Sequence, residues 1–116
     1  WALDVLSNEN PHGIILNCSS PEAITQAMPI MEVLSIPFGG FANGFTSIYP
    51  LSPGSTVDEL SARKNLSPKI YSEYVFQWIE AGATIVGGCC EIGPEHIEFL
   101  KIHLEVNGHR LTTLPV

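Results

Sequence analysis

Residues 83–90, with the sequence ATIVGGCC, restrict the fold of this chain more than any other stretch. Their first part is apolar and β-branched, which predicts a short buried strand. Because neighbouring side chains of a regular strand point to opposite faces, Cys89 and Cys90 can serve one site only if the backbone turns. We expect Gly87 and Gly88 to provide that turn, since glycine tolerates positive φ. Two thiols are thus predicted at the carboxyl end of a strand, just before a helix.

The chain before this stretch alternates between strand patterns and helix patterns. Alternation of this kind is typical of parallel strands joined by crossover helices, so the predicted class is α/β. The strands are predicted within residues 13–18, 36–42 and 83–86, each followed by a helix. Residues 1–12 are predicted to be a polar segment with a turn, and a long polar loop is predicted from residue 43 to about 66.

Each predicted helix begins with a proline that follows a small residue. Ser20 is the predicted N-cap of the first helix, Ser67 precedes the second, and Gly93 is the predicted N-cap of the third. Pro29 is expected to end or kink the first helix, leaving a separate piece at 30–34. The spacing of large side chains predicts the buried faces of the later helices. These consist of Tyr71, Tyr74, Val75, Trp78 and Ile79 in the second, and of Ile97, Leu100 and Leu104 in the third.

The composition excludes several classes of partner. The 116 residues carry a net charge of −7, and their five Lys and Arg residues form no cluster, which argues against nucleic acid and anionic membranes. No apolar run approaches the ~18 residues of a membrane span, and no secretory signal opens the chain. Three cysteines, two of them adjacent, make a poor disulfide framework, so we expect a reducing, cytoplasmic location.

Cys18 and the pair Cys89–Cys90 occupy the same kind of position, after an apolar strand and before a helix. The carboxyl ends of parallel strands lie on one face, where α/β proteins build their sites. Three thiols on one face suggest zinc, with the fourth tetrahedral position open to a substrate. Other interpretations are free core cysteines, a thiol-redox pair, or a closed structural zinc site completed by a histidine or Glu91.

These residues carry a resemblance to a known family. Gly87-Gly88-Cys89-Cys90 followed by residues 93–97 (GPEHI) resembles the signature of the zinc-dependent homocysteine S-methyltransferases. Asn17-Cys18 and residues 42–44 (ANG) resemble two further motifs of that family. The resemblance covers residues 13–106 and implies that Cys18, Cys89 and Cys90 are zinc ligands.

The family fold is a (β/α)8 TIM-type barrel, and the resemblance implies that residues 1–116 form its carboxy-terminal three βα units. A complete barrel needs roughly 250 residues. The chain opens on Trp1 without an initiator Met, so we expect the rest of the barrel to lie amino-terminal to it. The residues that bind the homocysteine amino group are expected there as well, and the 116 residues alone are expected to be inactive.

The resemblance implies methyl transfer from a small donor to homocysteine, giving methionine. The residues 93–97 look most like those of members that use a sulfonium donor, S-methylmethionine or S-adenosylmethionine. Betaine and methylfolate are the alternative donors, and a structural zinc-binding or non-catalytic fragment is the alternative function.

Other residues have competing roles. Asn43 either binds substrate or makes the turn after its strand. His96 is interpreted as a surface or capping residue, and Phe38, Phe41 and Phe45 as core residues or the lining of a substrate cleft. If the three cysteines share one zinc ion, their sulfurs must lie about 3.8 Å apart, and up to roughly 5 Å without the metal. Cys18 would then reach across the strand predicted at 36–42.

Overall fold

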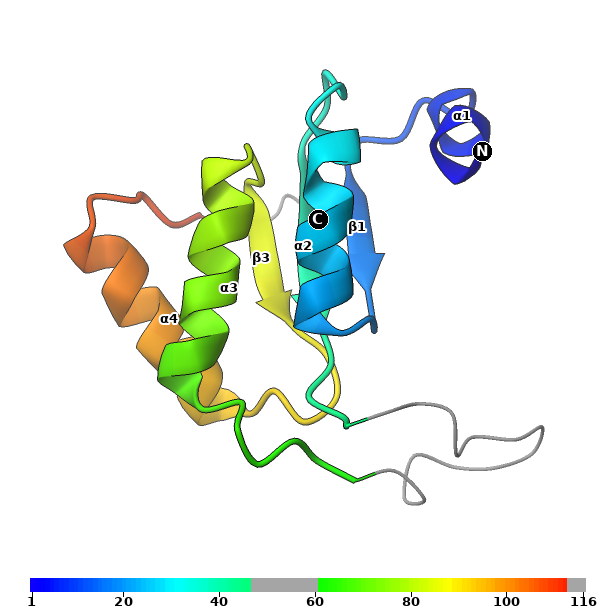
Figure 1. Ribbon diagram of the computed structural model, residues 1–116. Coiled ribbons are helices and arrows are strands. Elements are labelled where there is room, and N and C mark those ends of the chain that lie inside the picture. The colour runs from blue at the N-terminus through cyan, green and yellow to red at the C-terminus, as the bar shows by residue number, and fades with distance from the viewer. Residues whose placement is uncertain (47–60, 113–116) are drawn as a thin grey trace.

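The computed structural model describes residues 1–46 and 61–112, which form a parallel sheet covered by helices (Figure 1). The elements in chain order are α1 (Ala2–Ser7), β1 (Ile14–Asn17), α2 (Pro21–Met31), β2 (Phe38–Ala42), α3 (Pro68–Glu80), β3 (Ile85–Gly88) and α4 (Pro94–Val106). None of the described helices is both long and apolar enough to cross a membrane.

The sheet has the strand order β1-β2-β3, and both pairs of strands are parallel. Asn17 pairs with Phe41, and Phe41 pairs with Gly87, so the three carboxyl ends lie side by side. The predicted α/β class and the predicted alternation of strand and helix are therefore confirmed for three βα units.

Helices α2 and α3 lie on the same face of the sheet, and α4 packs against α3 (Figure 1). The helices approach the sheet closely at Gly40, where a Cβ atom would lie 2.8 Å from Ile24 and 3.4 Å from Trp78. The core contains the predicted inner face of α3, with Tyr71, Val75 and Trp78 fully buried. Large apolar side chains of the other two helices complete the core: Ile24, Met28, Met31, Leu100 and Leu104.

The predicted helix starts are confirmed. The Ser20 hydroxyl accepts a hydrogen bond from the Ala23 N–H, and the Ser67 hydroxyl accepts one from the Ile70 N–H. Each N-cap is followed by proline at the first helical position, where the missing N–H is not needed. Gly93 is the N-cap of α4. Local sequence signals therefore determine where these three helices begin.

Several predicted boundaries are wrong. Pro29 lies inside α2, which continues to Met31, because a proline so close to the carboxyl end removes only one of the last intrahelical hydrogen bonds. β2 begins two residues later than predicted, and the Pro37 carbonyl accepts from the Ile14 N–H ahead of it. β3 spans Ile85–Gly88 in place of 83–86, so both of its glycines belong to the strand.

Two segments also differ from their predicted environment. The amino-terminal segment, predicted to be polar with a turn, has that turn at residues 8–9, but it also contains the helix α1, none of whose residues is buried. On α4, Ile97 is 41% exposed although it was predicted to face the core, while His96 is buried. The surface prediction for His96 is therefore wrong.

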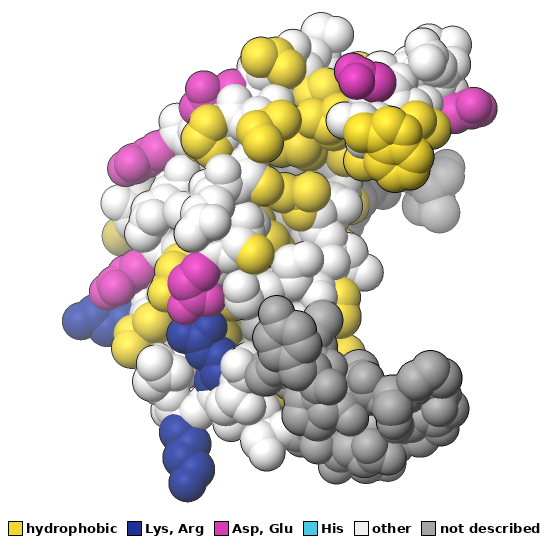
Figure 2. Space-filling view, turned by 45° about the vertical axis from the view of Figure 1, so that its right-hand side comes forward, with side chains coloured by type: hydrophobic (Ala, Val, Ile, Leu, Met, Phe, Trp, Pro, Cys, Tyr) yellow, Lys and Arg dark blue, Asp and Glu magenta, His cyan; other side chains and the backbone are white. Residues whose placement is uncertain are grey.

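Apolar side chains gather on the surface where α1 and the end of α2 lie (Figure 2). The exposed ones are Trp1, Val5, Leu6, Ile30 and Val33. Lysine and arginine side chains are few and spaced apart on the face shown in Figure 2, with no cluster of the kind that binds phosphate backbones.

Candidate metal centre

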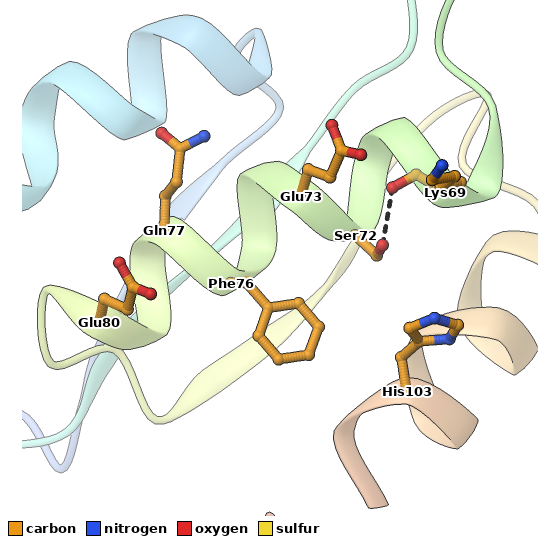
Figure 3. A pocket seen from close by; sticks show the side chains of 7 residues that line it. All are labelled: Lys69, Ser72, Glu73, Phe76, Gln77, Glu80 and His103. Atoms are coloured by element: carbon orange, nitrogen blue, oxygen red, sulfur yellow. Dashed lines mark hydrogen bonds between the residues drawn. The ribbon is translucent and has the colours of Figure 1, made fainter. Parts of the chain in front are cut away.

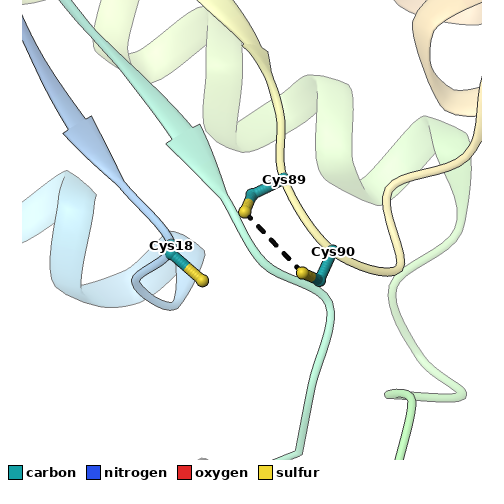
Figure 4. A group of neighbouring side chains, drawn as sticks. All are labelled: Cys18, Cys89 and Cys90. Atoms are coloured by element: carbon teal, nitrogen blue, oxygen red, sulfur yellow. Dashed lines mark hydrogen bonds between the residues drawn. The ribbon is translucent and has the colours of Figure 1, made fainter. Parts of the chain in front are cut away.

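The three cysteines meet at the carboxyl edge of the sheet (Figure 4). Cys18 follows β1 directly, Cys89 and Cys90 follow β3, and their sulfur atoms all lie within 4.8 Å of one another. The Sγ atoms of Cys89 and Cys90 are 3.9 Å apart. Thiolates that share a tetrahedral zinc ion have sulfurs about 3.8 Å apart. The predicted proximity is confirmed, while the predicted role as metal ligands stays a prediction.

Cys18 reaches the pair across the end of β2, as expected from the strand order. Its backbone has a positive φ of 53°, which turns the chain toward β2 immediately after β1. The Cys18 N–H donates to the Phe41 carbonyl at 2.9 Å, and the Asn43 side-chain amide donates to the Cys18 carbonyl at 2.9 Å. The end of β2 therefore fixes the position of the first thiol.

Asn43 is 3% exposed, and its amide is used within the protein. Besides the Cys18 carbonyl, its Nδ2 lies 4.0 Å from the Cys18 sulfur, and its Oδ1 accepts from the Phe45 N–H. Through these contacts Asn43 stabilises the turn that follows β2. Binding of substrate by Asn43 stays a prediction.

The turn at the cysteine pair differs from the expected one. The glycines with positive φ among the described residues are Gly82 and Gly108, whereas the turn after the pair occurs at Glu91, with φ of 63°. Gly87 and Gly88 instead provide space, because a Cβ at Gly87 would lie 2.8 Å from the Phe41 ring and one at Gly88 would overlap the Ile92 side chain.

Backbone hydrogen bonds tie the pair to the end of β2. The Cys89 N–H donates to the Ala42 carbonyl, and the Gly44 N–H donates to the Cys90 carbonyl, both at 2.8 Å. The loops after all three strands are thus joined through residues 41–44. A site on these loops is held in place before any ligand binds, which favours binding.

The three thiols differ in acidity. Burial raises the pKa of the Cys89 thiol, but hydrogen bonds from the Cys90 N–H and from the Cys18 and Cys90 thiols outweigh this and lower it. The hydrogen bond to Cys89, together with burial, raises the pKa of Cys18, and the same two causes raise that of Cys90. Cys89 is therefore the thiol that loses its proton first.

The donor set fits zinc. Thiolates are the ligands that favour zinc over hard cations such as Mg²⁺ and Ca²⁺, and these three can occupy three corners of a tetrahedron. Within residues 1–46 and 61–112, no histidine, aspartate or glutamate joins the group. Glu91 and the histidines, the predicted candidates for a fourth protein ligand, are thus not assembled around the sulfurs.

The hydroxyl of Tyr71 and the pair Arg63–Glu22 also adjoin this edge of the sheet, and no sequence pattern predicted either. Tyr71 was predicted only as a core side chain, yet its hydroxyl reaches the Gly87 carbonyl at 2.6 Å. Arg63 pairs with Glu22 across 41 positions of sequence. Helical spacing shows that a side chain faces the core but cannot show which backbone group it meets.

Two surface grooves lie elsewhere on the molecule. One, of about 330 Å³, lies between α3 and α4 (Figure 3) and is lined by Lys69, Ser72, Glu73, Phe76, Gln77, Glu80 and His103. The other, of about 480 Å³, runs beside β3 and α4 and is mainly apolar. Neither is lined by a cysteine, so neither is part of the candidate metal centre.

The core role is confirmed for two of Phe38, Phe41 and Phe45, and lining of a substrate cleft stays a prediction. Phe38 and Phe45 are buried, each 5% exposed, while Phe41 is half-buried beside Gly87. They are packing residues of the sheet and of the loop that follows it.

Comparison with known proteins agrees with this geometry. No solved structure matches the chain. The family model for homocysteine S-methyltransferase matches residues 2–104, a span that contains all three cysteines. A match over most of the 116 residues establishes that this chain belongs to the homocysteine S-methyltransferase family.

Proposed function

We propose that this protein takes part in zinc-dependent transfer of a methyl group to the thiolate of homocysteine, giving methionine. The observation that carries the proposal is the meeting of three thiols within 4.8 Å in a chain of this family. Cys18, Cys89 and Cys90 are the proposed metal ligands. Three free thiols suit a reducing compartment, and we propose the cytoplasm.

The chain itself supplies three thiolates and leaves the fourth position open. When bound, zinc supplies the Lewis acidity that lowers the pKa of a substrate thiol and keeps it nucleophilic at neutral pH. The homocysteine sulfur then attacks the methyl carbon in line with the leaving group. A carbon–sulfur bond forms to homocysteine, the bond to the donor breaks, and its electron pair stays with the donor. No protein side chain is needed as general base.

We propose a sulfonium donor, S-methylmethionine or S-adenosylmethionine. The donor loses its positive charge when the methyl group leaves, and it becomes a neutral thioether. A cationic donor suits a site made of thiolates in a chain of net charge −7. Turnover with betaine or methylfolate, and none with either sulfonium, would contradict this choice.

We also propose that the three βα units are the carboxy-terminal part of a (β/α)8 barrel. All three strands are parallel, and among the described residues the outer edges of β1 and β3 pair with no other strand. The remaining strands, amino-terminal to Trp1, would close the barrel and bind the homocysteine amino and carboxylate groups. Residues 1–116 alone are then expected to bind metal but to lack methyl transfer activity.

The test measures metal in the reduced protein. We expect one zinc ion per chain, lost in Cys18→Ser, Cys89→Ser and Cys90→Ser, because two thiolates do not hold the ion tightly. Ser19→Ala is the matched control, since this exposed neighbour of Cys18 bonds only to the Asn17 carbonyl through its hydroxyl. Full zinc content in any of the three cysteine variants would overturn the ligand assignment.

The open position is tested with cobalt in place of zinc. Homocysteine should change the thiolate-to-cobalt charge-transfer bands, because its sulfur adds a fourth thiolate. Methionine, whose sulfur carries a methyl group and no proton, is the control and should leave the bands unchanged. A spectrum unaffected by homocysteine would favour a closed structural site over a catalytic one.

A further inference from the structure

The hydroxyl of Tyr71 lies between two strands of the sheet. It donates to the Gly87 carbonyl of β3 at 2.6 Å and accepts from the Ala42 N–H of β2 at 3.3 Å. In a regular parallel pair those backbone groups bond to the facing strand. A side chain of α3 therefore joins both strands at the last ladder position before the two cysteines.

The hydrogen bonds before and after β3 show that one extra residue lies where this strand begins. The Thr84 N–H donates to the Phe38 carbonyl, and the Cys89 N–H donates to the Ala42 carbonyl. The donors are five residues apart (89 − 84) and the acceptors four (42 − 38). An extra residue in one strand of a pair is a β-bulge.

The bulge decides which residues of β3 face the site. In a regular strand the N–H groups that point to one neighbour recur at every second residue, which from Thr84 gives Val86 and Gly88. The observed donor is Cys89, and the pairs from Gly39–Ile85 to Ala42–Gly88 keep one register, so the shift lies between Thr84 and Ile85. This shift, and not a positive φ at the glycines, accompanies the placement of both adjacent thiols near Cys18.

We propose that Tyr71 is a positioning residue for the metal centre: its hydroxyl bridges the Ala42 N–H of β2 and the Gly87 carbonyl of β3 and so holds Cys89 and Cys90 on the side of Cys18. The inference rests on the proposed function, because it assigns Tyr71 to the same three-cysteine site.

The ring of Tyr71 is held firmly enough for this role. Its side chain is fully buried, and it meets Trp78 and His96 edge to face, with ring centroids 6.0 Å apart in each case. Burial raises the pKa of Tyr71 to about 12, so the hydroxyl keeps its proton at neutral pH and donates to the Gly87 carbonyl.

The test compares Tyr71→Phe with Tyr74→Phe. Both remove one hydroxyl from α3, but the hydroxyl of Tyr74 donates to Glu22, away from the bulge. Zinc affinity is measured by competition with a chelator, and site geometry by the cobalt absorption spectrum. Loss of a group that orients metal ligands typically weakens metal binding by about 10- to 100-fold. We expect that loss, with shifted charge-transfer bands, in Tyr71→Phe and little change in Tyr74→Phe.

The spectrum keeps the test valid if Tyr71→Phe folds poorly, since the position of the bands reports the bound sites and not the folded fraction. Wild-type affinity and wild-type bands in Tyr71→Phe would overturn the proposal, as would equal losses in both variants. If the wild-type protein binds neither metal, the proposed function fails separately. The placement of the thiols is then tested with phenylarsine oxide, which bridges two neighbouring thiols, and unchanged uptake by Tyr71→Phe would again overturn the inference.

Discussion

An ion pair between Arg63 and Glu22 lies close to the candidate metal centre. Both terminal nitrogens of the Arg63 guanidinium donate to the Glu22 carboxylate at 2.8 Å, and the Tyr74 hydroxyl donates to the same group at 2.9 Å. The Arg63 N–H also donates to the carbonyl of Gly44, whose own N–H donates to the Cys90 carbonyl and whose neighbour Asn43 donates to the Cys18 carbonyl. Arg63 is 15% exposed and Glu22 44%, so solvent weakens the pair without removing it.

Glu22→Gln should destabilise the protein in a pH-dependent way. The hydrogen bonds from Arg63 lower the pKa of Glu22 from 4.5 to about 2, so its contribution is complete above pH 4.5 and is lost as the pH falls toward 2. We expect the variant to unfold about 1 kcal/mol more easily at pH 7, with the difference shrinking in acid.

Urea denaturation at pH 7, 5 and 3 measures this difference. Glu98→Gln, at an exposed position of α4, is the matched control and should leave the free energy of unfolding nearly unchanged at each pH. A deficit in Glu22→Gln that stays constant from pH 7 to 3 would show that lost packing, and not the lost charge, is responsible.

At the scale of single residues, the sequence predicted the cysteines better than their surroundings. The shared position of Cys18 and the pair after strand patterns was enough to predict that they meet. The need for glycine at positions 87 and 88 was not predictable. It depends on which side chains pack there, Phe41 of β2 against Gly87 and Ile92 of the following turn against Gly88. Such requirements arise from tertiary packing, which a local pattern does not contain.

Among the helices, α4 is held by His96, whose capping role was predicted but whose burial was not. His96 caps it, as one interpretation had it, since its Nδ1 accepts from the Gly93 N–H at 3.2 Å. Its Nε2 lies 2.8 Å from the Leu66 carbonyl, which places the hydrogen on Nε2 and ties α4 to the residue before the N-cap of α3. The ring is 8% exposed, so neither bond can be replaced by water easily.

His96→Ala should destabilise the protein by about 1–3 kcal/mol, because it leaves the Gly93 N–H and the Leu66 carbonyl without their partner. His96→Gln should lose less, since glutamine at this helical position can still accept from the N-cap N–H. His12→Ala, at an exposed histidine, is the control for thermal or urea unfolding. Equal stability of His96→Ala and wild type would exclude the capping role.

Helix starts and strand existence were predictable, whereas helix continuation was not. Ser20 and Ser67 with their prolines are local signals, and their capping bonds are local too. Helix α2 continues past Pro29 to Met31, and burial of Met28 and Met31 in the core stabilises this last turn. Helix α1 has no buried residue, and its six residues are too few for a helical period to be recognised in the sequence.

For the molecule as a whole, the alternation of strands and helices was enough to predict a parallel sheet, because parallel strands require crossovers. The strand order followed only from the family resemblance, since short apolar strands carry little information about their neighbours. The metal centre needs that order: β2 separates β1 from β3 and contributes through Phe41, Ala42 and Asn43 the bonds that hold both sets of thiols.

A metal ion bound by the three cysteines would also be a cross-link, because the cysteines follow strands that are not neighbours in the sheet. β1 and β3 share no hydrogen bonds in the sheet, and Cys18 and Cys89 are 71 residues apart in the chain (89 − 18). An ion joining them closes a loop that spans two crossovers, and closing a long loop restricts the unfolded chain most.

Zinc should therefore raise the melting temperature and slow amide hydrogen exchange in β1, the strand that would otherwise open from the edge of the sheet. Exchange followed by mass spectrometry with and without zinc measures this, and Cys18→Ser should remove the protection of β1 while leaving α3 unaffected. Equal exchange of β1 in both states would mean that the ion does not join the strands. If it does, the centre that we propose to activate a substrate sulfur also controls how long β1 stays attached to the sheet.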